Sequence, residues 1–499
     1  MTSAFPREVD LLVIGGGING VGVARDAAGR GLATLLVERD DLASATSQWS
    51  TKLIHGGLRY LEHYEFRLVG ESLAEREVLL AQAPHLIEAL SFVLPHEPHL
   101  RPAWMIRAGL FLYDRIGGRM SLPRSFGVDL ERSRWGAGLK HRFSKGFVYA
   151  DARVDDARLV VLTAAAARNH GADIRTRTRF TGAVRDDGAW KATIADDAGT
   201  HVVRAKAIVN VGGPWVADVL KSISAAPTGA SVRHVKGSHI VVPRVHDEAH
   251  AYILQNADKR IVFVIPWQDR FTLIGTTDVP VTDYDQPHIS DQEVDYLLEL
   301  ANAYLEKPLT RADVVWSYSG VRPLYDDGKS DPSSITRDYV LKIDAGERDA
   351  QCPVLSIYGG KLTTYRKLAE AALQALRPWF PALKPAWTER DTLPGGDIPN
   401  HDRDAWIADV ARRYPKLPAT LTRDLARRHG SLATTVLGDA KTRADLGREF
   451  GGNLFEREVE HFVRHEWATT ADDVLWRRTK SGLLMDAAQR EAVATHLGR

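Results

Sequence analysis

The stretch DLLVIGGGINGVGVARDAAGRGLATLLVERD, residues 10–40, constrains the fold more than any other part of the sequence. An apolar run leads directly into Gly15, Gly17 and Gly20, which match the pattern GxGxxG at the start of a helical segment. In that setting the first glycine permits a tight turn, the second lets a pyrophosphate approach the backbone, and the third lets the helix pack on the strand. Glu38 ends the next apolar run, where an acid accepts hydrogen bonds from an adenosine ribose. The pattern predicts a β-α-β unit that binds a dinucleotide, without saying which one.

Length and composition limit the class of protein. The 499 residues exceed one ordinary domain and predict two or three. Hydrophobic residues make up 44% and charged residues 26%, which is typical of a soluble globular protein. A net charge of +1 gives no basic field that would favour nucleic acid as a partner. The single cysteine, Cys352, excludes an internal disulfide and a CxxC pair, so we expect a reducing, cytoplasmic environment.

Neither a secretory signal nor a membrane-spanning helix is expected. The N-terminal residues MTSAFPREVD lead straight into the first strand without an apolar targeting segment. The longest apolar run, which starts at Leu159, has about half of the roughly 18 residues that a spanning helix needs. If a membrane is involved, we expect the protein to lie on its surface.

The order of strand, glycine pair and helix recurs twice later in the chain. KAIVNV precedes Gly212 and Gly213, and CPVLSIY precedes Gly359 and Gly360. Between these returns the apolar period changes to that of antiparallel strands, as in SHIVVPRV and RIVFVIPW. One cofactor-binding sheet interrupted by a second sheet favours FAD, a long cofactor held at both ends, over a nicotinamide dinucleotide.

Several longer motifs resemble one family. They are IGGGINGVGVARDAAGRGL, STKLIHGGLRYLE, KGSHIVVP, IGTTD, YSGVRPL, ITRDY, GGKLTTYRKLAE and, in the helical tail, HEWATTADDVLWRRT. Together they resemble the aerobic, FAD-dependent glycerol-3-phosphate dehydrogenases, nearly from end to end. One departure is SQWS around Trp49, which is bulkier than the run of small residues expected there.

The resemblance implies an α/β fold with three parts. These are a glutathione-reductase-like, Rossmann-type FAD-binding domain, an interleaved antiparallel β substrate domain and a helical C-terminal domain. The expected ranges are 1–390 for the FAD-dependent oxidoreductase region, with FAD-binding segments at about 8–80, 150–220 and 350–378 and a substrate-binding sheet at about 230–345, and 391–499 for the helical domain.

The resemblance also implies the reaction. It is the oxidation of sn-glycerol 3-phosphate to dihydroxyacetone phosphate, with electrons passing from FAD to membrane quinone. The protein would associate peripherally with the inner face of the cytoplasmic membrane, and a homodimer is plausible.

Four cations are candidates to bind the substrate phosphate: Arg59 in GGLRY, Arg322 in SGVRPL, Arg337 in ITRDY and Lys361 in GGKLT. Each interrupts or follows an apolar or glycine-rich segment, and the fork of arginine matches phosphate oxygens. A salt bridge or a surface side chain is the alternative for each of them. Arg59 and its neighbour Tyr60 could serve the flavin instead.

Two histidines are candidates for the catalytic base, because histidine titrates near neutrality. His239 in KGSHIVVP is preferred to His55 in KLIHGG, since the second sheet should cover the flavin. Either residue could instead be an ordinary core histidine. Arg322 is included with them in the catalytic set. No metal site is expected.

The cofactor-binding prediction covers the glycine turns, the acid that follows the second strand, and the loops beside them. An ordinary polar loop is the alternative for Ser44, Thr46, Ser47 and Lys52. The predicted residues are Gly15, Gly17, Ile18, Asn19, Gly20, Glu38, Arg39, Ser44, Thr46, Ser47, Lys52, Leu53, His55, Gly56, Gly57, Gly212, Gly213, Gly359, Gly360, Lys361, Leu362 and Thr363.

Other functions remain open at the level of sequence. The chain could be an oxygen-using glycerol-3-phosphate oxidase, an amino acid or amine oxidase of the same fold, or a flavin-binding protein without activity. For membrane contact, the segment LRPAWMIRAGLFLYDRIGGRM, residues 100–120, combines apolar residues with arginines, although a core helix is an equal alternative. The basic segment around Trp476, Arg477, Arg478 and Lys480 is the next candidate.

Overall fold

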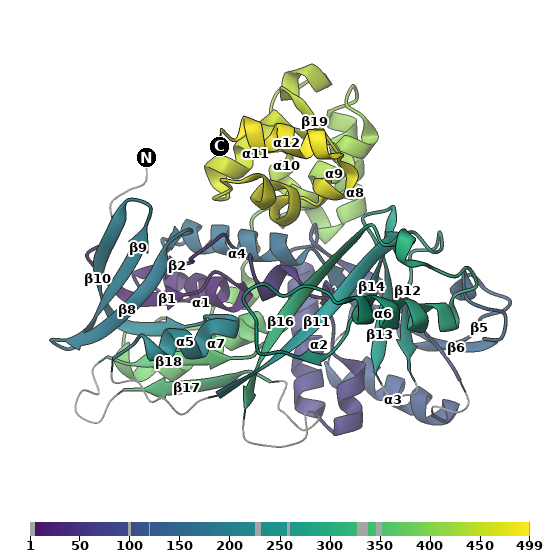
Figure 1. Cartoon of the computed structure of the whole chain (residues 1–499), viewed down its shortest axis with the longest axis horizontal. Coiled ribbons are helices and arrows are strands. Elements are labelled where there is room, and N and C mark those ends of the chain that lie inside the picture. The colour runs from purple at the N-terminus through teal and green to yellow at the C-terminus, as the bar shows by residue number, and fades with distance from the viewer. Residues whose placement is uncertain are drawn as a thin grey trace.

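The computed structural model describes residues 5–97, 101–118, 120–224, 231–256, 260–326, 338–345 and 352–498. Two sheets lie side by side, and a helical unit formed by the C-terminal part of the chain sits above them (Figure 1). Arg337, one of the four predicted phosphate ligands, lies outside the described residues.

The first sheet has a parallel centre of apolar strands. β1 lies between β10 and β2, and β18 and β7 extend this parallel order on the two sides. β17 adds an antiparallel edge, and the β8–β9 hairpin pairs with β10 and covers one face. The bounds are β1 Glu8–Ile14, β2 Thr34–Val37, β7 Asp173–Arg175, β8 Arg179–Asp186, β9 Ala189–Asp196, β10 Gly199–Asn210, β17 Val340–Asp344 and β18 Val354–Tyr358.

Three helices cover the other face: α1 (Ile18–Gly29), α4 (Asp156–Asn169) and α7 (Tyr365–Leu376). Their small residues let them pack closely. A Cβ at Gly22, for example, would come within 2.8 Å of the ring of Tyr365, so α1 and α7 touch where α1 has no side chain. The predicted β-α-β unit is therefore a packed layer of helices on a parallel sheet.

The second sheet is mainly antiparallel and runs in the order β15-β11-β14-β13-β12-β4-β6-β3, with β16 beside β11 and β5 beside β6. α6 (Asp291–Tyr304) packs on one face, and α2 (Phe66–Gln82) and α3 (Ala103–Ile116) pack on the other. The strands are β3 Leu53–Ile54, β4 Ile87–Pro95, β5 Phe126–Asp129, β6 Lys145–Val154, β11 Ser231–Pro243, β12 Ala251–Gln255, β13 Ile261–Trp267, β14 Phe271–Gly275, β15 Val279–Pro280 and β16 Trp316–Asp326.

The second sheet is wider than the range of about 230–345 predicted for it. Strands β3 to β6, from residues 53–154, complete it, while β17 at Val340–Asp344 joins the first sheet instead. The alternation of apolar and polar residues predicts that a segment is a strand, but it does not show which distant strand it pairs with. That pairing decides to which sheet the strand belongs.

The C-terminal part contains α8 (Arg403–Arg413), α9 (Ala419–His429), α10 (Ala433–Leu437), α11 (Glu456–His465) and α12 (Ala487–His496), with a small β19–β20 pair at Glu449–Gly451 and Leu454–Phe455. Buried residues from Ile398 onward form two hydrophobic cores of their own. The predicted α/β fold class, with an interleaved second sheet and a helical C-terminal part, is confirmed.

The basic segment near the C-terminus does not face solvent. Arg478 and Lys480 are buried, Arg477 is nearly so, and both arginines form ion pairs with Asp41. The suggestion that this segment is an alternative membrane contact is therefore wrong. Across the described part of the chain, every helix is too short or too polar to cross a membrane.

Candidate cofactor and substrate site

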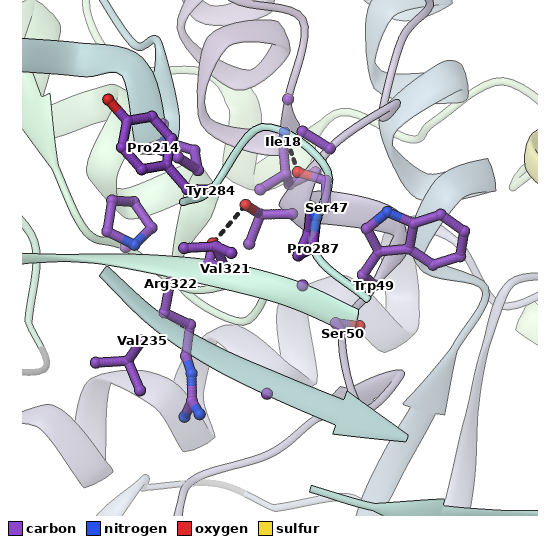
Figure 2. A pocket seen from close by; sticks show the side chains of 18 of the residues that line it. Ile18, Ser47, Trp49, Ser50, Pro214, Val235, Tyr284, Pro287, Val321 and Arg322 are labelled. Atoms are coloured by element: carbon purple, nitrogen blue, oxygen red, sulfur yellow. Dashed lines mark hydrogen bonds between the residues drawn. The ribbon is translucent and has the colours of Figure 1, made fainter. Parts of the chain in front are cut away.

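A cavity of about 1730 Å³ lies between the two sheets. It is larger than the roughly 300–1,000 Å³ of an ordinary ligand pocket. The glycine turns of the first sheet form one wall, and β11, β16 and the segment after β14 form the other. In Figure 2, Val321 and Arg322 lie on opposite sides of their strand, as strand alternation requires. The volume of the cavity is large enough for a long cofactor and a small substrate to bind together.

The first glycine turn brings the ends of β1 and β10 together. Gly15 has a φ of +118°, and a Cβ there would come within 2.5 Å of the carbonyl oxygen of Val211. Gly17 caps α1 without a side chain, while the Ile18 N–H donates to Ser47 Oγ at 3.0 Å (Figure 2). The positive end of α1 consequently opens on the cavity and is suited to bind an anion.

Glu38 lies where the sequence places the acid of the β-α-β unit. Its carboxylate accepts hydrogen bonds from the N–H groups of Gly16 and Asp40 at 2.6 and 2.9 Å. Burial raises the pKa of Glu38, and the two backbone donors oppose that shift. Beside it, the guanidinium of Arg39 lies 3.8 Å from the ring centre of Trp215. Both side chains line the same end of the cavity.

The other two glycine pairs border the same cavity. Gly359 and Gly360 both have positive φ, and Asn19 donates to the carbonyl of Gly359 at 3.1 Å, which joins the start of α1 to this turn. Gly212 and Gly213 follow β10 next to the first turn. Leu53, Gly57, Leu362 and Thr363 also line the cavity. The three glycine turns, the first and last of which are more than 300 residues apart in sequence, thus line the same cavity.

His239 projects from β11 into the cavity. Its Nε2 lies 3.0 Å from Thr51 Oγ1, its ring stacks on Tyr318 with centres 4.8 Å apart, and its Nδ1 has no hydrogen-bond partner among the described residues. A Cβ at Gly275 would come within 2.1 Å of this ring, so the neighbouring strand leaves room for it. Burial lowers the pKa of His239 well below 6.5, and the charges of Lys52 and Arg322 add to this effect. The imidazole is therefore neutral near pH 7.

His55 follows β3 of the second sheet, lines the cavity, and makes an edge contact with the ring of Phe263 on β13. Burial lowers the pKa of His55, whereas Asp151 opposes the shift. Its backbone N–H donates to Thr363 Oγ1 at 3.2 Å. This contact ties the HGG turn to the third glycine turn.

Three of the four predicted phosphate ligands border the cavity. Lys361 Nζ lies 4.0 Å from the ring centre of Tyr60 and, within the described structure, this buried ammonium has no hydrogen-bond acceptor. Arg322 is half-exposed and donates to Asp278 Oδ1 at 2.9 Å. Arg59 also lines the cavity. Cations from three different segments thus line the same cavity.

Two predicted cofactor residues have other partners. The Lys52 ammonium is buried and lies 2.9 Å from Asp156, and it also donates to the carbonyl of Gln48. Burial lowers the pKa of Lys52, while Asp156 opposes the shift. Gly56 N–H donates to the hydroxyl of Tyr113 at 2.9 Å. Neither residue is part of the described cavity lining, because the chain turns both of them into the core beneath it.

Trp49, the bulky residue in SQWS, is accommodated by a glycine on the facing strand. A Cβ at Gly320 would come within 2.7 Å of Trp49 Cβ. The indole (Figure 2) stacks on Tyr318, and its ring centre lies 5.9 Å from that of Trp316. All three aromatic residues line the cavity. Trp49 is therefore part of the aromatic wall beside His239.

A possible metal-ligand cluster lies away from this cavity. His429, His461 and Glu466 have ligand atoms within 4.8 Å of one another in the described structure. Arg158, however, forms a buried ion pair with Glu466, and His429 is hydrogen bonded to Glu458. The positive charge of Arg158 disfavours a cation at that point.

Comparison with known proteins gives two family matches. The FAD dependent oxidoreductase family matches residues 10–342, which is more than half of the chain, and the C-terminal domain of alpha-glycerophosphate oxidase matches residues 386–497. The chain belongs to the FAD-dependent oxidoreductase family. The predicted resemblance to the aerobic glycerol-3-phosphate dehydrogenases within it is confirmed by the following relatives.

The chain is 52% identical to the aerobic glycerol-3-phosphate dehydrogenase of Escherichia coli strain K12 over 98% of this chain and 97% of that protein. It is 48% identical to the D-erythritol 1-phosphate dehydrogenase of Brucella abortus, again over 98% and 97%. Among solved structures, the glycerol-3-phosphate dehydrogenase of Bacillus halodurans complexed with FAD matches with a TM-score of 0.76 and 28% identity, over 99% of this chain and 90% of that one.

The site of this FAD-dependent oxidoreductase fits the cofactor of its family. The turns at Gly15 and Gly360 have no space for a side chain, since a Cβ would meet Val211 in one case and Asn19 in the other. They leave bare backbone facing the cavity beside the uncapped start of α1. These features suit the pyrophosphate of a dinucleotide, and the large volume of the cavity suits FAD.

A polar network behind the second wall was not evident from the sequence. Glu293 Oε1 accepts from Ser238 Oγ at 2.8 Å and from Thr277 Oγ1 at 2.7 Å, and Oε2 lies 2.8 Å from Lys236 Nζ. Ser238 precedes His239 on β11, and Thr277 precedes Asp278. The only signal in the sequence was Ser290 with Glu293, a capping box that predicts the start of a helix.

We predict that Glu293→Gln destabilises the protein in a pH-dependent way. Burial alone would raise the pKa of Glu293, but hydrogen bonds from Lys236, Ser290, Thr277 and Ser238 lower it to about 2. Because this folded value is below the ordinary 4.5, the stabilisation is complete above about pH 4.5 and is lost as the pH falls toward 2. Urea unfolding should show a loss of about 1–3 kcal/mol at pH 7 that shrinks below pH 4.5.

The control is Glu299→Gln, the same change at an exposed position of α6. It should change the free energy of unfolding by less than about 0.5 kcal/mol at any pH. An equal effect of the two substitutions, or a loss in Glu293→Gln that is independent of pH, would contradict the assignment of Glu293 as an ionised anchor.

Proposed function

We propose that this chain oxidises sn-glycerol 3-phosphate to dihydroxyacetone phosphate, with FAD as the first electron acceptor and membrane quinone as the next. The buried ammonium of Lys361 carries the proposal, because it has no hydrogen-bond acceptor among the described residues and Lys361 is part of the cavity lining. A buried cation of this kind needs an anionic partner. The name of the Escherichia coli relative supports the same substrate.

The phosphate group would bind between Lys361, Arg59 and Arg322. Arg322 now donates to Asp278 at the rim, and a phosphate dianion would compete for that guanidinium with more acceptor oxygens. Arg337 stays a predicted fourth ligand. A carboxylate substrate, as in the amino acid oxidases considered above, needs fewer cations than this cavity presents.

His239 would remove the proton from the secondary hydroxyl. Its neutral imidazole, held by Thr51 and stacked on Tyr318, would provide the lone pair that accepts this proton. The bound FAD supplies the acceptor for the hydride from the adjacent carbon. Tyr318 and the space at Gly275 would keep the His239 ring oriented through the reaction. His55 is the alternative base.

Anaerobic addition of sn-glycerol 3-phosphate to the holoenzyme should bleach the flavin absorbance. Lys361→Met should weaken substrate binding by about tenfold to a hundredfold, because it removes a charge-assisted contact worth roughly 1.5–3 kcal/mol, while the FAD content stays normal. The apparent dissociation constant from bleaching titrations is the measurement.

D-erythritol 1-phosphate and an amino acid mixture serve as alternative substrates in the same assay, and quinone analogues and oxygen serve as alternative acceptors. Bleaching by erythritol phosphate alone, or by amino acids alone, would reject the proposed substrate. Faster reoxidation by oxygen than by quinone analogues would reject the proposed acceptor.

His239→Gln should slow flavin reduction by about 10² to 10⁴ in single-turnover experiments and leave substrate binding largely intact. Stopped-flow absorbance under anaerobic conditions measures this rate. His55→Gln is the matched comparison. If His239→Gln reduces flavin within about threefold of the wild-type rate and His55→Gln does not, the base is His55.

Membrane contact through α3 is part of the proposal. Trp104, Met105, Phe111 and Leu112 are exposed, with Trp104 at 70%, and their spacing of seven residues puts them on one face of the helix. Tyr64 and Phe66 are exposed on the neighbouring segment at the start of α2. The helix lies at the edge of the molecule far from the C-terminal unit (Figure 1). This apolar face supports a surface-bound orientation from which quinone could be reached.

We expect Trp104→Ser combined with Phe111→Ser to reduce flotation with anionic liposomes by at least about tenfold, because each side chain contributes roughly 1.5–3 kcal/mol on burial. The control is Val184→Ser with Val202→Ser, which removes two exposed apolar side chains from the β8–β10 region. Equal flotation of both variants would exclude α3 as the membrane contact.

A further inference from the structure

The C-terminal helical unit reaches the loop that lines the cofactor end of the cavity. Asp41, which begins this loop, is buried, and its carboxylate accepts from Arg478 Nη2 at 2.8 Å and from Arg477 Nε at 2.6 Å. Both arginines belong to the C-terminal unit, more than 430 residues away in sequence. The contact is therefore a connection between domains in which Asp41 and Arg478 are buried and Arg477 is only slightly exposed.

The opposite side of the same loop contacts the first glycine turn. Ala43 N–H donates to the carbonyl of Gly16 at 3.1 Å, and Ser47 Oγ accepts from the N–H of Ile18 at 3.0 Å. Ser44 N–H donates back to the carbonyl of Asp41, which stiffens the segment between them. Residues 43–47 line the cavity. A displacement of Asp41 would therefore shift Ala43 and Ser47, which contact the backbone at the start of α1.

A second ion pair supports the same region. Asp473 of the C-terminal unit accepts from Arg177 Nη2 at 2.7 Å, and the Arg177 N–H donates to the carbonyl of Asp40 at 2.7 Å. The next N–H, of Thr178, donates to the carbonyl of Glu38 at 2.8 Å. The C-terminal unit therefore holds both ends of the turn that carries Glu38.

Arg478 is itself fixed by its own domain. It is fully buried, and its Nε donates to the carbonyl of Glu466 at 3.1 Å. Removing one partner of such a buried pair leaves an uncompensated charge, which is strongly destabilising locally. The position of Asp41 consequently depends on the docked C-terminal unit.

We propose that the C-terminal helical unit is a positioning element for FAD, acting through Arg478 and Asp41 on the loop of residues 40–47. Undocking at this point frees the loop and weakens cofactor binding before the rest of the protein unfolds. The role does not depend on which substrate is oxidised. Asp41 and Arg478 lie outside the cavity lining, whereas the proposed substrate-site residues Lys361 and His239 are part of it.

Other ion pairs between the same two parts of the molecule provide a matched control. Arg403 of α8 pairs with Glu88 of β4, and Arg427 of α9 pairs with Asp269 at the β13–β14 turn. Neither partner belongs to the cavity lining or to the 40–47 loop. Their loss weakens docking without touching the cofactor loop.

The experiment compares Arg478→Lys, which keeps the charge but loses the bidentate contact, with Arg403→Gln. The FAD dissociation constant is measured by flavin fluorescence after reversible removal of FAD, and the temperature of FAD release is compared with that of unfolding followed by circular dichroism. Arg478→Lys should raise the dissociation constant by about tenfold or more and release FAD below the unfolding temperature. Arg403→Gln should lower only the unfolding temperature.

If both variants change FAD affinity and unfolding to the same extent, the pair serves only to join the domains and the proposal is overturned. An unchanged FAD affinity in Arg478→Lys overturns it as well. Arg477→Gln, which removes one donor from Asp41 at a less buried position, is the second variant if Arg478→Lys does not fold. Asp41→Asn combined with Arg478→Lys should be no worse than the more severe single variant, because both act through one contact.

Discussion

The close approach of two strand ends at Gly15 is the constraint on which the site depends. A Cβ at Gly15 would come within 2.5 Å of the carbonyl oxygen of Val211, and one at Gly20 within 1.9 Å of the carbonyl oxygen of Gly15. Only backbone without side chains lets β1, β10 and the start of α1 meet there. The other cofactor-side segments are aligned to this point by hydrogen bonds, through Glu38 to Gly16 and through Asn19 to Gly359.

The second wall uses burial in two opposite ways. Burial keeps His239 neutral, since no acid among the described residues compensates a charge on its ring, and the nearby cations Lys52 and Arg322 strengthen the effect. Behind the same strand, four hydrogen-bond donors keep the buried carboxylate of Glu293 ionised. Strand alternation separates the two groups, because Ser238 faces Glu293 and His239 faces the cavity. A proton acceptor and a fixed structural charge can therefore occupy neighbouring positions of one strand.

Much of the site was predictable because its motifs are local. The cofactor turn from Gly15 to Glu38 lies within one β-α-β unit, and its geometry follows from glycine spacing. The later glycine pairs, His239, Arg322 and Lys361 were found by the same local patterns and by resemblance. Lys52 was misplaced, because a lysine in a polar loop gives no sign that it turns inward to Asp156. Glu293 was missed, since the capping box with Ser290 already accounts for a glutamate at this position. Nothing in the sequence indicates its further contacts with Ser238 and Thr277.

By itself, the sequence determined the cofactor class, the α/β fold and the helical C-terminal part, because each depends on periodicity and spacing within short segments. The tertiary structure alone decided which strands share a sheet, as with β4 to β6 in the second sheet and β17 in the first. It also decided that Trp476, Arg477 and Arg478 face the interior and that Arg478 meets Asp41. Contacts between residues hundreds of positions apart depend on how whole layers pack, and no local pattern encodes them.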